Sequence, residues 1–314
     1  MTLLTVLAAV SLATATPSTD TTFAVGTGTR LSLENYMGSV AISAWSRDAV
    51  RVRAQHHHNT TVTIDRSPGR LELSASGHWG VPGTVDWDVT IPAWMAATVE
   101  GVGTDVSIQG VQGELKIDTV KGDVTITRCM AAEASSVEGQ VTIGECRGHI
   151  SAQSVNEVVR IRGCKGEVNG ESVNGDVIVQ CPESHDVEAS SVNGDVVMSG
   201  PFVDGGSYSL SAHNGDIVVG VPERASLSVS VSTYGGGLSS DFPLTFNEKK
   251  KGREYRFTLG SGAASLELES FQGEVKLLRL ESWNKELQRR ESEKDKDKDK
   301  DDENRDDDED KGDK

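Results

Sequence analysis

The motif that decides the fold of this chain reads Val120-Lys121-Gly122-Asp123-Val124-Thr125-Ile126. It returns as Val137-Glu138-Gly139-Gln140-Val141-Thr142-Ile143, and later as Val173-Asn174-Gly175-Asp176-Val177-Ile178-Val179 and Val192-Asn193-Gly194-Asp195-Val196-Val197-Met198. A shorter copy lies at His213–Ile217 and a degenerate one at Val155–Val158. From residue 102 to residue 192 the copies begin 17 to 19 residues apart. This fixed interval is typical of a repeat protein.

A weaker copy lies midway in each interval, for example at Val111–Ile117 and Cys164–Val168. The elementary unit is therefore about nine residues long, a five-residue strand followed by a four-residue turn. In each unit Val or Ile alternates with Thr, Ser, Lys or Glu, which is the period-two pattern of a half-buried strand. A glycine at the same place in each turn permits backbone angles that other residues adopt only at a cost.

One such unit cannot bury its apolar side chains alone, so the copies must stack. Two units in a coil of about 18 residues predict an all-β fold. The predicted architecture is a flattened parallel β-solenoid whose coils are hydrogen-bonded to one another at ~4.8 Å. An antiparallel meander is the alternative, because a four-residue turn can also close a hairpin. The solenoid is favoured because it stacks the recurring Asn-Gly-Asp turns, whereas a meander has no need to repeat them.

The rest of the chain is organised around this repeat. Residues 1–15 are predicted to be a signal peptide, because Leu3–Ala15 is uncharged and ends in a small-x-small cleavage pattern. This apolar stretch is too short to span a bilayer as a helix. We expect an N-terminal β-rich cap and first coils over residues 22–100 and regular solenoid coils over 101–222. Further coils and an irregular C-terminal β cap are expected over 223–283.

Residues 284–314 are dominated by Asp, Glu, Lys and Arg and contain no aromatic residue. Such a segment has too little apolar surface to fold, so it is predicted to be a disordered acidic tail. The whole chain of 314 residues carries a formal net charge of −17, which argues against nucleic acid as a partner. We expect an exported protein, periplasmic, cell-surface or extracellular, with no membrane span in the mature chain.

Four cysteines, Cys129, Cys146, Cys164 and Cys181, are separated by 17, 18 and 17 residues. This spacing matches the repeat and predicts that they stack in successive coils. Cα atoms of neighbouring coils would lie ~4.8 Å apart, which a disulfide can bridge, whereas ~9.6 Å between alternate coils is too far. Pairing all four thiols then requires Cys129–Cys146 and Cys164–Cys181. A column of reduced, buried thiols is the alternative. A metal site is not expected, since four thiolates in a straight column cannot converge on one ion.

A second polar column lies in the turns, where Asp176, Asp195 and Asp216 recur one coil apart. Carboxylates at ~4.8 Å repel each other unless water or a cation screens them, so these are candidate calcium ligands. Calcium-binding nine-residue repeats carry more Gly and Asp than this chain does. The structural interpretation is a ladder of stacked turns formed by Asn174, Gly175, Asn193, Gly194, Asn214 and Gly215.

Groups that could support catalysis do not converge in the sequence. His56–His58 alternates across a strand, and the other histidines lie at different phases of the repeat. The chain has no nucleophile elbow with a suitable partner, no phosphate-binding loop and no metalloprotease motif. The sequence therefore predicts a protein that is not an enzyme and that uses no cofactor.

Several of these motifs together resemble a known family. Gly38–Ile42 followed by Trp45, then Trp87–Pro92, and then the Val-x-Gly-Asp-Val-x-Ile series resemble the bacterial putative-adhesin β-strand-repeat family over residues 22–280. The resemblance implies an exported, adhesin-like domain of unknown function at the cell surface or envelope. It implies no catalytic residues.

The sequence thus favours an exported, non-enzymatic, adhesin-like protein of the envelope or extracellular surface. Its β-solenoid would be a scaffold for contact with a macromolecule that the sequence does not name. Two alternatives stay open at this point. One is a polysaccharide-acting β-helix enzyme, which would need grouped acids and bases on one face. The other is a calcium-stabilised structural module.

Overall fold

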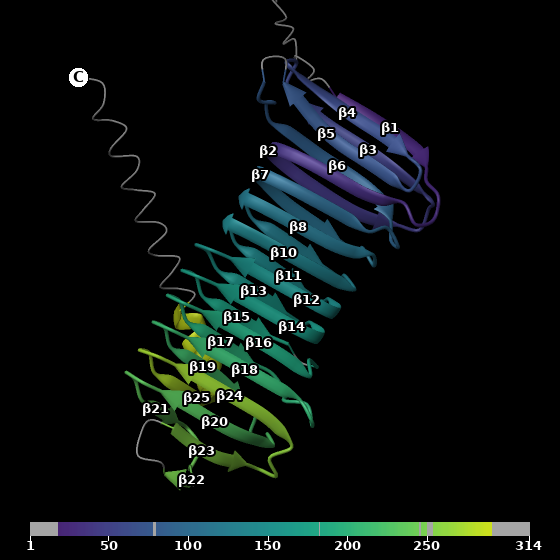
Figure 1. Cartoon of the computed structure of the whole chain (residues 1–314). Helices are drawn as coiled ribbons and strands as arrows, with labels where there is room; N and C mark the ends of the chain where they lie inside the picture. Colours follow the sequence, from purple (N-terminus) through teal and green to yellow (C-terminus); the bar gives the residue numbers. More distant parts are fainter. Residues whose placement is uncertain (1–17, 78–79, 182, 245, 250–253, 291–314) are drawn as a thin grey trace, which may run out of the picture.

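The computed structural model describes residues 18–77, 80–181, 183–244, 246–249 and 254–290. The predicted signal peptide and residues 291–314 of the predicted tail lie outside these ranges. The described chain forms a long rod of stacked β-coils that runs from an N-terminal cap to a C-terminal group of strands (Figure 1). Most strands are parallel and belong to one continuous sheet that is not closed.

The repeat region forms a parallel solenoid, in which each coil contributes one longer and one shorter strand. The longer strands are β8 (Glu114–Lys121), β10 (Ala131–Glu138), β12 (Arg147–Ser154), β14 (Lys165–Ser172), β16 (Asp186–Ser191) and β18 (Ser207–Ala212). The shorter strands are β9 (Val124–Thr127), β11 (Val141–Gly144), β13 (Val159–Arg162), β15 (Val177–Gln180), β17 (Val196–Ser199) and β19 (Ile217–Val221).

Each strand pairs in parallel with its counterpart one coil away, as β10 does with β8 and β12, and β11 with β9 and β13. The predicted two-unit solenoid is confirmed, and the meander is not adopted. The two units of a coil are unequal, however. The longer strands have six to eight residues and the shorter ones four or five.

The core consists of files of like side chains stacked along the rod. In β8, Leu115 and Ile117 point inward and are buried, while Lys116 points outward. The same inward positions recur in the next coil, where Leu115 pairs with Ala132 and Ile117 with Ala134. Because the side-chain period of a strand is two, one register keeps every apolar file in the interior.

The four valines Val120, Val137, Val155 and Val173 also form one file, as the repeat predicts. Thr119 and Lys121 pair with Ser136 and Glu138, which places Val120 beside Val137. The Asn156 and Asn174 N–H groups then donate to the Val137 and Val155 carbonyls. This file lies on the outside of the rod, with each valine 37–51% exposed.

The N-terminal end closes the rod with antiparallel strands. Its elements are β1 (Ser18–Ala24), β2 (Arg30–Trp45), β3 (Ala49–His56), β4 (Thr60–Ser67), β5 (Arg70–Gly77), β6 (Val85–Pro92) and β7 (Ala97–Gln109). The long strands β2 and β7 pair in parallel, while β3 pairs antiparallel with β1 and β6, and β4 with β5. These strands cover β2, so the first coil does not present a bare edge.

The C-terminal coils do not stack in sequence order. The elements are β20 (Leu227–Thr233), β21 (Leu238–Ser240), β22 (Phe246–Lys249), β23 (Glu254–Leu259), β24 (Ala264–Ser270) and β25 (Val275–Arg279). Strand β24 pairs in parallel with both β18 and β20, and β25 with both β19 and β21. The last coil of the chain is therefore inserted between the two coils that precede it, and β23 pairs antiparallel with β20 at the end.

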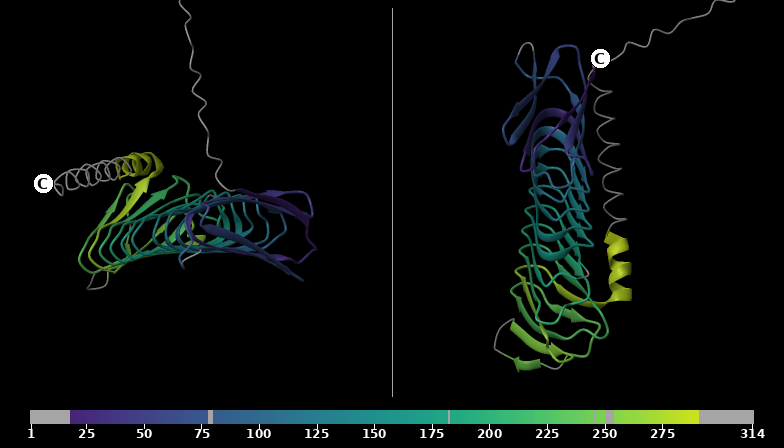
Figure 2. Two further views of the ribbon diagram at one scale, coloured as in Figure 1. Left: turned by 90° about the horizontal axis from the view of Figure 1, so that it is seen from above. Right: turned by 90° about the vertical axis from the view of Figure 1, so that its right-hand side faces the viewer.

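One helix, residues 280–290, follows β25 and lies along the rod (Figure 2). This corrects the prediction of a disordered tail from residue 284, because residues 284–290 are helical. The physical reason is an apolar pair four residues apart, Trp283 and Leu287, which is buried against the outside of the coils. The described helix is not long and apolar enough to cross a membrane.

Candidate interaction surface of the solenoid

The predicted turn ladder is built from stacked amides. The Asn174 Nδ2 donates to Asn156 Oδ1 at 2.7 Å, Asn193 donates to Asn174 at 2.7 Å, and Asn214 donates to Asn193 at 2.6 Å. Asn174 and Asn193 thus each accept from one neighbouring coil and donate to the other. The chain of hydrogen bonds fixes the spacing of the turns at the surface.

The glycines of the ladder are required by close approach of the backbone. A Cβ at Gly194 would lie 2.1 Å from the Gly175 carbonyl oxygen, and one at Gly215 would lie 2.0 Å from that of Gly194. The predicted reason, an unusual backbone angle, holds instead at Gly122, whose φ is +124°. At Gly194 and Gly215 any side chain would push two coils apart.

A buried serine precedes Gly175 and Gly194 by three residues. The Ser191 Oγ accepts the Gly194 N–H at 2.9 Å and donates to the Gly175 carbonyl at 2.8 Å. Ser172 makes the corresponding contacts with Gly175 and Glu157. We did not predict this role, although the recurring Ser-Val-Asn-Gly sequence signals it. The serine satisfies turn groups that no strand partner reaches.

The aspartates of the ladder accept backbone hydrogen bonds from the next coil. Asp176 Oδ1 accepts the Asp195 N–H at 2.9 Å, and Asp195 Oδ1 accepts the Asp216 N–H at 2.7 Å. Asp216 Oδ1 accepts the Glu274 N–H at 2.8 Å, so the inserted coil continues the ladder. One oxygen of each carboxylate is therefore occupied by the main chain.

Cationic side chains neutralise the remaining oxygens at the C-terminal end of this ladder. Lys276 Nζ lies 2.8 Å from Asp216 Oδ2, and Arg290 of the helix pairs with both Asp195 and Asp216. Burial lowers the pKa of Lys276, but its hydrogen bond and ion pair with Asp216 outweigh this and raise that pKa above its usual value. Among the described residues no three His, Cys, Asp or Glu side chains group as a metal site. The structure therefore gives the calcium hypothesis no support.

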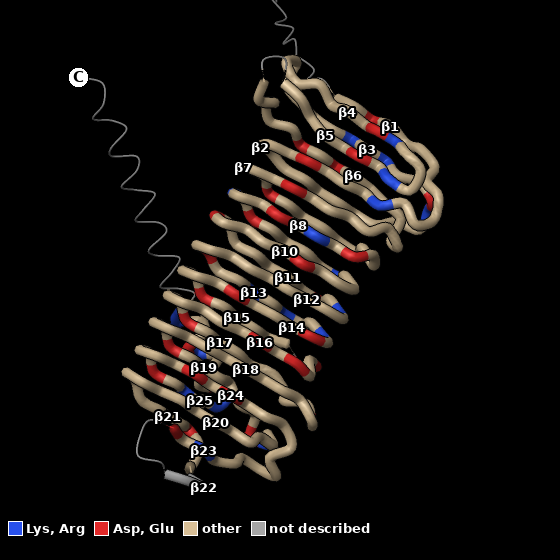
Figure 3. The backbone as a smooth tube through the Cα atoms, viewed as in Figure 1, with Lys and Arg blue, Asp and Glu red and all other residues tan. Residues whose placement is uncertain are grey.

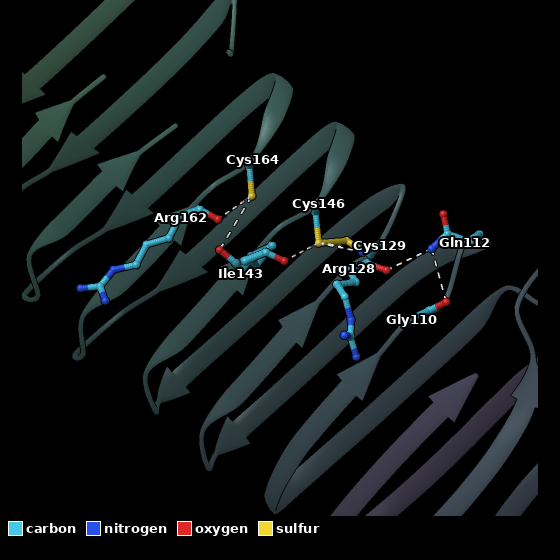
Figure 4. Close-up of a disulfide and its surroundings, with 9 residues drawn as sticks. Gly110, Gln112, Arg128, Cys129, Ile143, Cys146, Arg162 and Cys164 are labelled. Carbon is cyan, nitrogen blue, oxygen red and sulfur yellow. Dashed lines mark hydrogen bonds between the residues drawn. A yellow bond between two sulfur atoms is a disulfide. The ribbon is translucent and has the colours of Figure 1, made fainter. Parts of the chain in front are cut away.

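The cysteines stack as predicted in three coils out of four. Cys129 and Cys146 form a disulfide with Cα atoms 4.5 Å apart (Figure 4). Cys164 and Cys181 are free and buried, so the second predicted bridge is absent from the structure. The thiols of Cys164 and Cys181 donate to main-chain carbonyls. The interaction between the two thiols lowers the pKa of Cys164 and raises that of Cys181.

The register of the short strands explains this difference. Thr127, Gly144, Arg162 and Gln180 occupy one file. The first three cysteines each follow their strand end by two residues, whereas Cys181 follows Gln180 directly. Cys181 is therefore out of register with the column by one position. The coil from Arg162 to Gln180 is 18 residues long, whereas Cys164 and Cys181 are 17 residues apart.

Many Asp and Glu residues lie on the long strands of the rod (Figure 3). At the N-terminal end Glu34 pairs with Glu100, and Glu100 with Asp118, so three acidic residues share one file. Beside them a hollow of about 500 Å³ is lined by these carboxylates and by apolar side chains, including Tyr36 and Val120.

The exposed valine file continues well beyond the four residues that the repeat singled out. Its members in spatial order are Tyr36, Val102, Val120, Val137, Val155, Val173, Val192, His213, Phe271 and Tyr234. All are exposed. At its C-terminal end the rings of His213 and Phe271 are stacked at 4.7 Å, and Tyr234 lies 5.3 Å from Phe271. The rings thus extend the valine stripe without a gap.

Residues 159–278 match the family model described as Toastrack DUF4097. This segment is similar to the Toastrack DUF4097 family. The sequence-based resemblance to an adhesin-like repeat domain of unknown function is confirmed for it. The Toastrack segment begins at the first residue of β13 and ends within β25, so it contains the inserted coil. The coils upstream of it continue the same register from β2 onward.

Three solved structures are similar to the chain. One is a "putative cell adhesion protein" from Clostridium sporogenes, 10% identical, with a TM-score of 0.25, covering 84% of this chain and 100% of that one. A "putative adhesin" from Parabacteroides distasonis is 10% identical, with a TM-score of 0.41 and coverages of 83% and 97%. A "putative adhesin" from Parabacteroides merdae is 11% identical, with a TM-score of 0.38 and coverages of 83% and 95%. No curated protein matches the chain.

The histidines considered as catalytic or metal-binding candidates lie apart in the structure. His57 and His58 contact each other in the N-terminal cap, His149 pairs with Glu167 on the long strands, and His213 belongs to the exposed file of the Toastrack segment. The arrangement offers repeated surfaces along a rod.

Proposed function

We propose that this protein is an exported, non-enzymatic, adhesin-like rod that contacts a macromolecule of the envelope or extracellular surface. The observation that carries the proposal is the exposed file of ten residues, which presents nine apolar side chains and one histidine, one from each of ten stacked coils. A small ligand contacts one or two coils, whereas a macromolecule can use the same chemistry along the whole rod.

Export is supported by the disulfide between neighbouring coils. Cys129 and Cys146 are buried and bridged. Disulfides of this structural kind persist in oxidising compartments and are rare in the cytosol. The apolar stretch Leu3–Ala15, which lies outside the described residues, is in keeping with the same route.

A non-enzymatic role is supported by where the perturbed groups lie. Catalytic sites gather groups with shifted pKa values in an accessible cleft. Here the thiols of Cys164 and Cys181, whose pKa values shift in opposite directions, are buried in the core. Two further groups with shifted pKa values are in ion pairs: Lys276 pairs with Asp216, and Glu286 pairs with Arg289 and Arg290 of its own helix.

The test uses residues 1–314, so that the predicted signal peptide is retained. We expect external protease to degrade it on intact cells, and the purified protein to bind isolated envelope or surface material saturably. Incubation with charged and neutral polysaccharides is expected to release no new chain ends. Release of chain ends would overturn the proposal in favour of a polysaccharide-acting enzyme, and exclusive cytosolic recovery would overturn export.

A further inference from the structure

The exposed file forms a continuous, mostly apolar stripe along the rod. We call its ten members, Tyr36, Val102, Val120, Val137, Val155, Val173, Val192, His213, Phe271 and Tyr234, the valine file. Coils repeat at ~4.8 Å, so the stripe is roughly 40 Å long. Single exposed apolar residues need no explanation, but a contiguous apolar patch marks a contact surface.

The charge on one flank of the valine file is negative. Outward-facing neighbours lie two residues before each member, because side chains alternate along a strand. These neighbours are Glu34, Glu100, Asp118, Ser135, Gln153, Glu171, Ser190, Ser211, Glu269 and Ser232. Five are acidic and none is Lys or Arg. A second copy of this chain would bring carboxylates against carboxylates, so the charge favours a cationic partner.

The chain's own helix shows which element fits the outside of these coils. Trp283 and Leu287 pack on a second set of outward-facing apolar residues, contributed by four coils: Val158, Ile178, Val197 and Val218. Arg290, at the end of the helix, pairs with carboxylates of two neighbouring coils, Asp195 and Asp216. An amphipathic helix with a basic residue is thus seated along the rod (Figure 2).

The pitch of a helix is close to the spacing of the coils. A helix presents its apolar stripe once per turn, at about 5.4 Å, while the coils recur at ~4.8 Å. The mismatch of about 0.6 Å per turn leaves a straight helix in phase with the coils for about four turns.

We propose that the valine file is the docking surface for a basic amphipathic helix of a protein partner. The helix lies along the rod, with its apolar side chains on the valines and its Lys or Arg side chains over the flanking carboxylates. The hollow beside Tyr36, Val102 and Val120 receives its largest apolar side chain next to Glu100 and Asp118. This inference rests on the proposed function and specifies the chemistry of the partner.

The probe is a labelled peptide of about 18 residues, or about 27 Å of helix, with Leu on one face and Lys on the other. Fluorescence anisotropy measures its affinity for the full chain. We expect saturable binding that weakens with added salt. The triple variant Val137→Thr, Val155→Thr, Val173→Thr keeps β-branched residues in the strands and is expected to weaken binding by about tenfold or more.

The matched control replaces exposed apolar residues outside the file, by Met130→Thr and Val203→Thr. The control is expected to bind the probe like the unaltered chain. Equal binding by the triple variant, or equal loss in the control, would overturn the proposal. So would equal binding of a peptide with the same composition but no apolar face, or of one with Glu in place of Lys.

A dimer of the unaltered chain that the triple variant converts to a monomer, measured by light scattering, would assign the valine file to a second copy and also overturn the proposal.

Failure of the helix proposal can be distinguished from failure of the proposed function. If the unaltered chain binds envelope material but not the peptide, the wider proposal stands and only the helix is wrong. If neither ligand binds to the unaltered chain, both proposals fail.

Discussion

At the scale of the residue, the turns are fixed by contacts that leave no room for a side chain. Gly194 lies between the backbones of two neighbouring coils, and its N–H is held by the buried hydroxyl of Ser191. The aspartate that follows accepts an N–H from the next coil. Each turn therefore depends on one residue that is small and two that can accept hydrogen bonds.

Replacing Gly194 with Ala is expected to lower the free energy of unfolding by at least about 2 kcal/mol, within or above the usual cost of overpacking. The new Cβ would meet the Gly175 carbonyl oxygen at 2.1 Å, and only backbone movement can relieve that contact. Urea denaturation measures the loss. The control is Gly237→Ala, where nothing lies within 4 Å, and it is expected to be neutral or slightly stabilising. Equal effects of the two changes would contradict the close-approach argument.

The cysteine register makes a second prediction at this scale. Under non-reducing conditions, peptide mapping is expected to find Cys129 linked to Cys146, while Cys164 and Cys181 are alkylated only after unfolding, because both are buried. Replacing Cys146 with Ser is expected to cost about 3 kcal/mol, the usual value for a closed loop of this size. Detection of a Cys164–Cys181 link would show that Cys181 reaches the column after all.

At the scale of the element, the C-terminal helix covers outward-facing apolar side chains that would otherwise meet water. Earlier coils carry Thr125, Thr142 and Arg160 at the outward position of the short strand, whereas later ones carry Ile178, Val197 and Val218. The change from polar to apolar residues coincides with the coils that the helix covers. The helix and these strands are therefore one packing unit.

Replacing Trp283 with Ala is expected to undock the helix and to lower the free energy of unfolding by roughly 3 kcal/mol, the lower end for a buried aromatic side chain. Trp283 is 2% exposed and packs against Gly220, where a Cβ would lie 2.6 Å from the ring. Hydrogen exchange over residues 280–290 measures the undocking. Leu280→Ala, on the same helix but 39% exposed, is the control and should leave the exchange unchanged. Protection that survives in the Trp283 variant would contradict the docking role.

At the scale of the whole molecule, the rod is a sum of coils that contact only their neighbours. Stability in such an architecture is close to a sum of coil and interface terms. The cap strands cover one end, and β23 pairs at the other. Among the described strands none pairs along the full length of the rod, so a whole coil is the natural unit to remove.

Deleting residues 106–123 removes one whole coil and joins Asp105 to Val124, the partner of Val106 in the register. The shortened chain is expected to unfold cooperatively in urea, with a smaller m-value in proportion to the lost surface. Deleting only residues 106–114 removes half a coil and places a long strand where a short strand belongs. That control is expected to show no cooperative transition by circular dichroism. Cooperative folding of both deletions would contradict the two-unit coil.

The sequence by itself determined the solenoid, its coil length, the files of core side chains and the stacking of the turns. These features are local: period-two alternation and a turn every nine residues suffice, since each coil is bonded only to its neighbours. The recurring Ser-Val-Asn-Gly sequence also signals the buried serines. The position of Cys181 one residue after Gln180, rather than two, signals that it is out of register.

Only the tertiary structure decided the insertion of the coil β24–β25, the docking of residues 280–290 and the free state of Cys164 and Cys181. Each depends on which of several similar partners a segment meets. Strands β18, β20 and β24 all alternate buried with more exposed residues, so this pattern alone does not decide which of them pair. Likewise, Trp283 and Leu287 are two apolar residues next to a highly charged C-terminal segment. Their burial depends on the apolar surface that Ile178, Val197 and Val218 supply from other coils.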